Sequence, residues 1–219
     1  PEYSAEEIER FIERERVSAR ASVQRGITSV EIARRLALRP TQGREAAASY
    51  AFLTDQLLRL IFDFTVERLY PLNNPTSAER ISLIAVGGYG RGEMAPQSDI
   101  DIAFIFPYKQ TGWSEQVIES MLYMLWDLKL KVGHSSRTVA DCLRLGRDDI
   151  TIRTALLEHR FICGHAPLEA ELSDRLWGEL FKTTGPQFIE AKLAERAERH
   201  KRQGGQRYVL EPNVKEAKG

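Results

Sequence analysis

The sequence has few cysteines, no long apolar run and no excess of charge of either sign. Its two cysteines, Cys142 and Cys163, lack metal-ligand spacing, so we expect free thiols and neither a disulfide framework nor a cysteine metal centre. No apolar run of about 18 residues and no signal peptide occur, which predicts a cytoplasmic protein without membrane contact. The 31 basic and 31 acidic residues balance to a net charge of zero. Nucleic-acid partners are therefore disfavoured, because such proteins usually carry a basic excess.

Two acids stand one residue apart in the most informative stretch, residues 86–106. Side chains alternate along a strand, so Asp99 and Asp101 are predicted to share one face. Neighbouring carboxylates repel each other and are unfavourable beside an apolar core unless a divalent cation neutralises them. Mg²⁺ prefers oxygen ligands and usually brings substrate phosphates with it. We therefore predict a site for one or two Mg²⁺ ions at this pair; the alternative is a hairpin whose acids face solvent.

Gly87 and Gly88 directly follow the apolar run 81–86, which is predicted to be a buried strand. A turn without side chains exposes backbone N–H groups that can hold a phosphate, and glycine tolerates the positive φ of such turns. The dinucleotide-binding fingerprint does not fit, because Pro96 and a second strand follow where that motif opens a helix. No Walker sequence is present. The stretch therefore predicts a phosphate loop beside the metal site.

The Gly87-Gly88 pair, ten further residues and then Asp99-Ile100-Asp101 resemble the signature of the DNA polymerase β-like nucleotidyltransferase superfamily. More narrowly, residues 86–93 and 98–101 resemble the family of PII uridylyltransferases, the bifunctional uridylyltransferase/uridylyl-removing enzymes of bacterial nitrogen signalling. Later segments agree with that family, and the resemblance covers about residues 45–219. The agreeing segments are 130–138, 149–158 and 208–219.

The resemblance implies transfer of UMP from UTP to a tyrosine hydroxyl of the signal protein PII, with pyrophosphate as leaving group. Asp99 and Asp101 would bind Mg²⁺, and Gly87 and Gly88 would hold the β- and γ-phosphates. Further nucleotide contacts are implied at Arg91, Ser98, Asn213 and Lys215. All four have open alternatives: an ion pair with Glu93 for the arginine, a turn cap for the serine, and, for the two tail residues, a disordered tail that does not close over the nucleotide.

One departure from the superfamily concerns a third carboxylate, which its members commonly carry on a neighbouring strand. That strand is predicted near residues 130–137, where Gly133, His134 and Ser135 stand and no acid occurs. Either the acid pair suffices or another acid joins it from elsewhere. The histidine is a candidate base for the incoming hydroxyl or, alternatively, a structural residue. The candidate acids are Glu158, Glu211 and Glu216.

The predicted fold class is α+β, a small polymerase β-like mixed sheet with helices between two helical segments. Residues 1–77 form the N-terminal helical segment, and 78–145 form the catalytic domain. That domain holds two strands around the phosphate turn, a helix over 114–128 and a third strand near 131–137. Residues 146–219 form a helical unit, truncated at the C-terminus. Its helices are predicted over 149–163, 167–181 and 186–202.

Two rival functions remain open from the sequence. The nearer is the related glutamine synthetase adenylyltransferase, which has a similar glycine turn and acid pair but uses ATP. The more distant is a module that binds nucleotide or a partner without turnover. None of the four histidines is followed by Asp, so uridylyl-removing activity is not expected of this portion.

Overall fold

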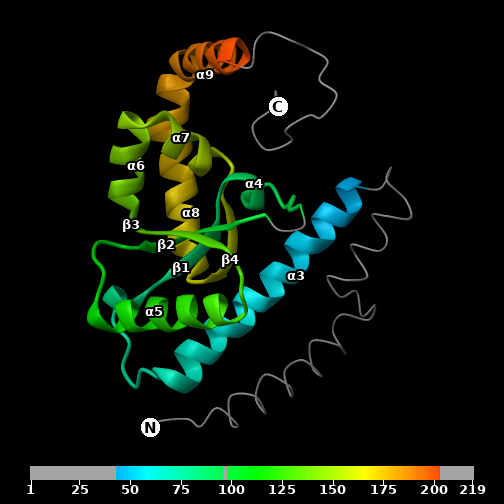
Figure 1. Cartoon of the computed structure of the whole chain (residues 1–219). Coiled ribbons are helices and arrows are strands. Elements are labelled where there is room, and N and C mark those ends of the chain that lie inside the picture. The colour runs from blue at the N-terminus through cyan, green and yellow to red at the C-terminus, as the bar shows by residue number, and fades with distance from the viewer. Residues whose placement is uncertain (1–42, 96–97, 203–219) are drawn as a thin grey trace.

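A mixed four-stranded sheet with the order β3-β2-β1-β4 forms the centre of the molecule (Figure 1). The computed structural model describes residues 43–95 and 98–202. Strand β1 pairs antiparallel with both β2 and β4, whereas β2 and β3 run parallel. The predicted α+β fold with a small mixed sheet is confirmed. The strands are β1 (Ser82–Ala85), β2 (Ile100–Phe106), β3 (Val132–Thr138) and β4 (Arg160–Gly164).

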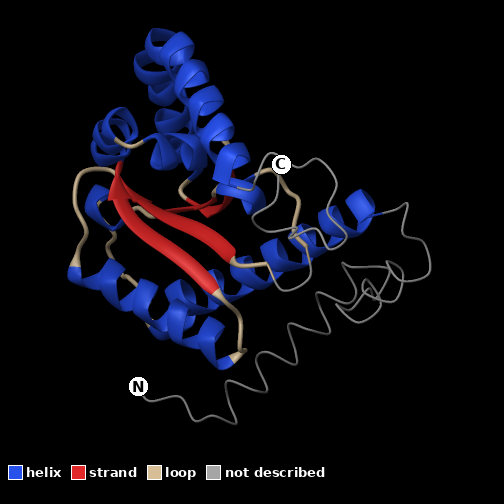
Figure 2. Ribbon diagram, turned by 45° about the horizontal axis from the view of Figure 1, so that its top comes forward, coloured by secondary structure: helices blue, strands red, loops and turns tan. Residues whose placement is uncertain are grey.

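Helices cover both faces of the sheet, as both views show (Figures 1 and 2). One face carries α3 (Gly43–Phe64) and α5 (Gly112–Asp127). The other carries α6 (Val139–Asp148), α7 (Ile150–Leu157) and α8 (Ala166–Arg175). The remaining described elements are the short turns η2 (Thr65–Leu69), η3 (Ser77–Glu79), α4 (Gly87–Gly90) and η4 (Leu176–Phe181), and the helix α9 (Lys182–Arg202).

Alternation along β2 divides the buried side chains into two cores. Ile100, Ile102, Phe104 and Phe106 pack with α3 and α5, as the strand period predicts. Ala103 and Ile105 belong to the opposite core, which α6, α7, α8 and η4 complete. Asp101 follows the same alternation and lies on the second face. The apolar residues of β2 thus anchor the strand on both sides and hold its acidic end at the rim of the second core.

The predicted strand near 131–137 and helix over 114–128 are confirmed, and side-chain caps mark the starts of α5, α6 and α7. Thr111 accepts from the backbone N–H of Ser114 at the start of α5, and Thr138 accepts from that of Asp141 at the start of α6. Asp149 accepts from two backbone N–H groups at the start of α7. These caps satisfy N–H groups that have no partner within the helix. No described helix is long and apolar enough to cross a membrane.

The helix predicted over 149–163 is wrong in its second half. Helix α7 ends at Leu157, and residues 160–164 form the edge strand β4 beside β1. These residues form a strand because Ile162 then packs in the core under α3 and the Arg160 side chain donates to the buried carboxylate of Asp55. The segment predicted as a purely helical unit from residue 146 therefore supplies one strand of the sheet.

Candidate active site

The glycine turn α4 leaves the end of β1 and doubles back beside β2. Gly87 has φ +59, a left-handed conformation that disfavours any residue with a Cβ. The turn is closed by hydrogen bonds from the N–H of Gly90 to the carbonyl of Val86, at 3.1 Å, and from the N–H of Arg91 to that of Gly87, at 3.3 Å. The first N–H groups of such a turn have no acceptor within it, so they are free to meet an anion.

Asp101 lies directly opposite this turn. A Cβ placed on Gly87 would stand 3.8 Å from Oδ2 of Asp101, and the backbone carbonyl of Asp101 accepts from the N–H of Val86 at 3.0 Å. Asp99 precedes β2 and is exposed. The two carboxyl groups are close enough for the charge of Asp99 to raise the pKa of Asp101. The structure thus brings the glycine turn and Asp101 together, with Asp99 just before the strand.

Gly133 lets the Asp101 carboxylate lie flat against strand β3. It pairs with Asp101 in the parallel register, and a Cβ on Gly133 would stand only 2.5 Å from Oδ1 of Asp101. Real Cβ atoms do not approach an oxygen this closely, so any larger residue here would displace the carboxylate. The neighbouring strand, where the superfamily commonly carries its third carboxylate, therefore has a glycine that leaves space for the carboxylate of Asp101.

Burial, and secondarily the charge of Asp99, raises the pKa of Asp101 above its ordinary value of 3.8. The charged carboxylate then destabilises the metal-free fold at pH values above the raised pKa, and this penalty disappears as the pH falls toward 3.8. Asp101→Asn is therefore expected to raise the free energy of unfolding at neutral pH but not near pH 3.8. Urea unfolding with a chelator present measures this, and a variant less stable than the wild type at neutral pH contradicts it.

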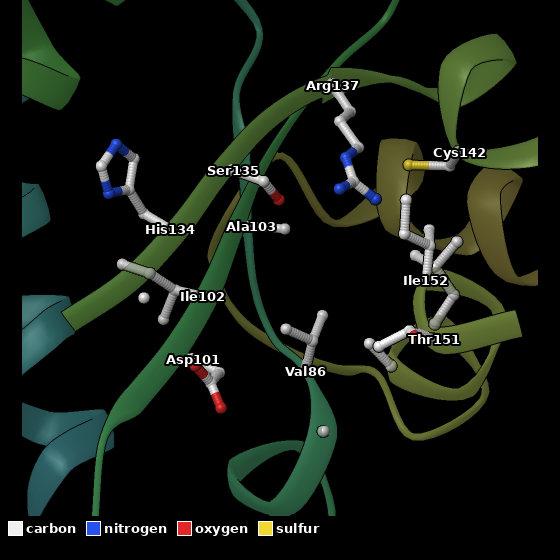
Figure 3. A pocket seen from close by; sticks show the side chains of 14 residues that line it. Val86, Asp101, Ile102, Ala103, His134, Ser135, Arg137, Cys142, Thr151 and Ile152 are labelled. Atoms are coloured by element: carbon white, nitrogen blue, oxygen red, sulfur yellow. The ribbon is translucent and has the colours of Figure 1, made fainter. Parts of the chain in front are cut away.

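A cavity of about 350 Å³ opens beside Asp101 and Gly87 and runs between β2, β3 and the helices α6 and α7 (Figure 3). Its walls combine apolar side chains with a few polar groups, a composition typical of small-molecule sites. The residues that line it are Val86, Gly87, Asp101, Ile102, Ala103, Gly133, His134, Ser135, Arg137, Cys142, Thr151, Ile152, Ala155 and Leu156.

A buried ionic network holds the glycine turn against the rest of the fold. Asp55 of α3 accepts from Nη1 and Nη2 of Arg160 at 2.6 and 3.0 Å, and from the hydroxyl of Tyr89 at 2.6 Å. Arg160 also donates to the carbonyls of Gly90 and Tyr89, at 3.2 and 3.3 Å. Burial, and then the hydrogen bond to Asp55, raises the pKa of Tyr89, so its hydroxyl stays protonated and donates. The network joins α3, α4 and β4, and the sequence analysis missed it.

Two predicted nucleotide contacts occupy the rim of the site. Arg91 donates to Oε2 of Glu158 at 2.6 Å and lies 3.7 Å from Glu93, so the ion pair considered as an alternative forms. Ser98 is exposed, and its N–H donates to the carbonyl of Ala95. Glu158, a candidate third acid, is thus paired with an arginine of the turn. The other candidates, Asn213, Lys215, Glu211 and Glu216, lie outside the described residues.

His134 points away from the acid pair, unlike its neighbours in β3. It pairs with Ile102, whose side chain lies in the α3–α5 core, and its ring meets the edge of Trp126 on α5 at 6.5 Å between centroids. Figure 3 shows the ring on the opposite side of the strand from Ser135. The structure supports the structural role of this histidine over its role as a base. Gly133, Ser135 and Arg137 take the site face instead, a pattern that the strand period could have indicated.

The residues present fit a magnesium site of the kind that the nucleotide completes. Asp99 and Asp101 offer hard oxygen ligands, and Gly133 leaves space against Oδ1 of Asp101. Within residues 43–95 and 98–202, no group of three or more His, Cys, Asp or Glu side chains gathers at a possible metal site. The remaining ligands of an ion at the acid pair would therefore come from phosphate oxygens and water.

Comparison with known proteins agrees with this geometry. The family model described as a nucleotidyltransferase domain matches residues 72–141, which include β1, the glycine turn, β2, α5 and β3. The fold and this match identify a nucleotidyltransferase domain in the chain. A second model, described as GlnD PII-uridylyltransferase, matches residues 187–219.

Several curated relatives are far more similar than a shared fold requires. The bifunctional uridylyltransferase/uridylyl-removing enzyme of Cereibacter sphaeroides is 64% identical over 208 residues, which cover 92% of this chain and 22% of the relative. Its counterpart in Ruegeria pomeroyi is 61% identical over 180 residues, covering 82% and 20%. That of Rhodospirillum rubrum is 51% identical over 189 residues, which cover 86% of this chain and 20% of the relative. The chain belongs to this family and spans about a fifth of the length of these relatives.

Proposed function

We propose that this chain transfers UMP from UTP to a tyrosine hydroxyl of the signal protein PII and releases pyrophosphate. The observation that carries the proposal is the placement of Asp101, with Asp99 beside it, against the Gly87 turn at the mouth of a nucleotide-sized cavity. The names of the relatives supply the nucleotide and the protein acceptor.

Each part of the site has a role in this reaction. The N–H groups of the turn at Gly87 and Gly88 bind the β- and γ-phosphates, and Asp99 and Asp101 hold one or two Mg²⁺ ions. When bound, Mg²⁺ neutralises the triphosphate and makes the α-phosphorus more electrophilic. The tyrosine hydroxyl loses its proton to water, its oxygen attacks that phosphorus in line, the bond from the α-phosphorus to the bridging oxygen breaks, and pyrophosphate leaves. Because Asp99 is exposed, the acceptor protein has access to this side of the site.

The proposed roles of Arg91 and Ser98 are contacts to the departing phosphates. Arg91 would have to leave Glu158, to which it now donates, or bridge between this carboxylate and the nucleotide. Asn213 and Lys215 remain predicted nucleotide contacts. Lys215→Ala is expected to weaken UTP binding, and an unchanged affinity would contradict that role.

The proposal is tested by supplying the chain with Mg²⁺, PII and either UTP or ATP while pyrophosphate release is followed. We expect release only when UTP and PII are present together. Release with ATP and glutamine synthetase instead would favour the adenylyltransferase. Nucleotide binding without release would favour a module without turnover.

Gly133→Ala is expected to lower the rate of transfer about 100-fold, because the new methyl group displaces the Asp101 carboxylate from its place by about an ångström. The matched control is Gly112→Ala at the start of α5, where a Cβ meets nothing within 4 Å. Steady-state pyrophosphate release measures both variants. Equal rates in Gly133→Ala and the control would show that the position of this carboxylate does not matter.

A further inference from the structure

Arg137 lies in the cavity at the end opposite the acid pair. In β3, Arg137 pairs with Ile105 of β2 and Gly133 pairs with Asp101 of β2, so four residues of strand, about 13 Å, separate the two ends. Both ends are on the same face of the sheet. Figure 3 shows the guanidinium directed into the cavity toward the space between Ala103 and Cys142. A ligand anchored by its phosphates at Asp101 would therefore reach Arg137 with its other end.

The guanidinium of Arg137 has no hydrogen-bond or ion-pair partner among residues 43–95 and 98–202, although it is half-buried. The charge of Arg137 helps to lower the pKa of Asp149, but Asp149 forms no ion pair with Arg137 and caps helix α7 through Oδ1. Arg153, on the adjacent helix, shows the usual arrangement: it donates to the carbonyls of Gly146 and Arg147. A guanidinium carries only donors, so an unpaired one directed into a cavity points to a ligand that accepts.

The walls between these two ends are mostly apolar, with the hydroxyl groups of Ser135 and Thr151 among them, and they suit a flat ring. Burial raises the pKa of the Cys142 thiol to about 12, so this group is neutral in the cavity. The Arg137 guanidinium carries only donors, whereas the polar anion-binding groups lie at the Asp101 end. This distribution places phosphates at one end and a ring with an acceptor at the other. The apolar wall residues are Val86, Ala103, Ile152, Ala155 and Leu156.

We propose that Arg137 donates a hydrogen bond to O4 of the uracil ring and so selects UTP; this inference rests on the proposed function. Of the two uracil carbonyls, O4 lies farther from the ribose and the phosphates, as Arg137 lies far from Asp101. Cytosine has the same ring size but carries an amino donor in place of O4, and adenine likewise presents an amino group on its pairing edge. An amino group of the base that faces Arg137 leaves both itself and the guanidinium without an acceptor, and this lowers the affinity for cytosine and adenine nucleotides.

The experiment titrates the chain, with excess Mg²⁺, with UTP, CTP and inorganic tripolyphosphate in a calorimeter. Arg137→Met removes every donor and is expected to weaken UTP binding at least tenfold, to bring the UTP and CTP affinities within about twofold, and to leave tripolyphosphate unchanged. Arg137→Lys retains one charged donor and restores part of the preference. The matched control is Arg144→Met, because Arg144 pairs with Asp141 at the exposed surface of α6.

The outcomes separate this inference from the function on which it rests. If Arg137→Met weakens the binding of tripolyphosphate as much as the binding of UTP, the arginine contacts phosphate and the base contact is refuted. If the variant keeps the wild-type preference for UTP over CTP, the inference also fails while the transferase function stands. If the wild type binds none of the three ligands with Mg²⁺, the proposed function fails together with the inference.

Discussion

Asp101→Asn is expected to lower the rate of UMP transfer by about 1,000-fold or more while the chain stays folded. The substitution keeps the shape of the side chain but removes half of the negative charge that holds Mg²⁺ at the phosphates, and electrostatic stabilisation of this kind dominates phosphoryl transfer. Asp99→Asn should have an effect of similar size, since its carboxylate is the other member of the pair. Pyrophosphate release at saturating UTP and PII measures both.

The control for this prediction is Asp174→Asn on the exposed surface of α8, outside the cavity. It changes the net charge by the same amount and should leave the rate unchanged. Circular dichroism checks that each variant is folded. A folded Asp101→Asn variant that keeps near-normal turnover with Mg²⁺ would refute the assignment of the acid pair.

Asp55→Ala is expected to destabilise the fold by about 3–5 kcal/mol, the largest stability change anticipated for a single substitution here. The change leaves the Arg160 guanidinium and the Tyr89 hydroxyl without their shared acceptor, in a site where the Asp55 side chain is only 10% exposed. Tyr89→Phe removes only one hydrogen bond and should cost about 1 kcal/mol. Urea unfolding at neutral pH, followed by circular dichroism, measures both.

The matched control is Glu171→Ala, which breaks the ion pair of Glu171 with Arg175, 3.8 Å apart on the surface of α8. Exposed ion pairs of this kind contribute little to stability, so the free energy of unfolding of the control should stay within about 0.5 kcal/mol of the wild-type value. If Asp55→Ala is no less stable than this control, the network does not hold the turn in place.

The sheet around the acid pair could be predicted because its signals are local. Alternation in Ile100–Phe106 sends four apolar side chains to one core and Asp101, with Ala103 and Ile105, to the other face, and glycines mark the turn before the strand. The period of two along the seven residues decides which of these side chains share a face. The same alternation in β3 would have separated Gly133 and Arg137 from His134, had it been applied there.

Strand β4 could not be predicted with the same ease. It has five residues, follows a helix after two residues, and lies at the edge of the sheet, so its pattern is too short to show a period. Its position is decided by Ile162 in the core and by Arg160 at the acceptors of the turn. Both are tertiary contacts that override local preference.

The Asp55 network could not be predicted from the sequence for a similar reason. Asp55 is one acid in an amphipathic helix, and its partner Arg160 follows 105 residues later. Nothing in either neighbourhood distinguishes this acid from a solvent-facing one. Only the packing of α3 against β4 brings the two charges together beside the glycine turn. Sequence patterns therefore indicated the proposed reacting groups, while the structure was needed to find what holds the glycine turn in place.

The most direct test of the magnesium-bound acid pair is a crystal structure of the chain with UTP and Mn²⁺ in place of Mg²⁺. We expect an anomalous peak between the carboxylates of Asp99 and Asp101 and the phosphate oxygens, with the β- and γ-phosphates against the N–H groups of Gly87 and Gly88. A nucleotide bound in the cavity with its metal away from both carboxylates would contradict the account.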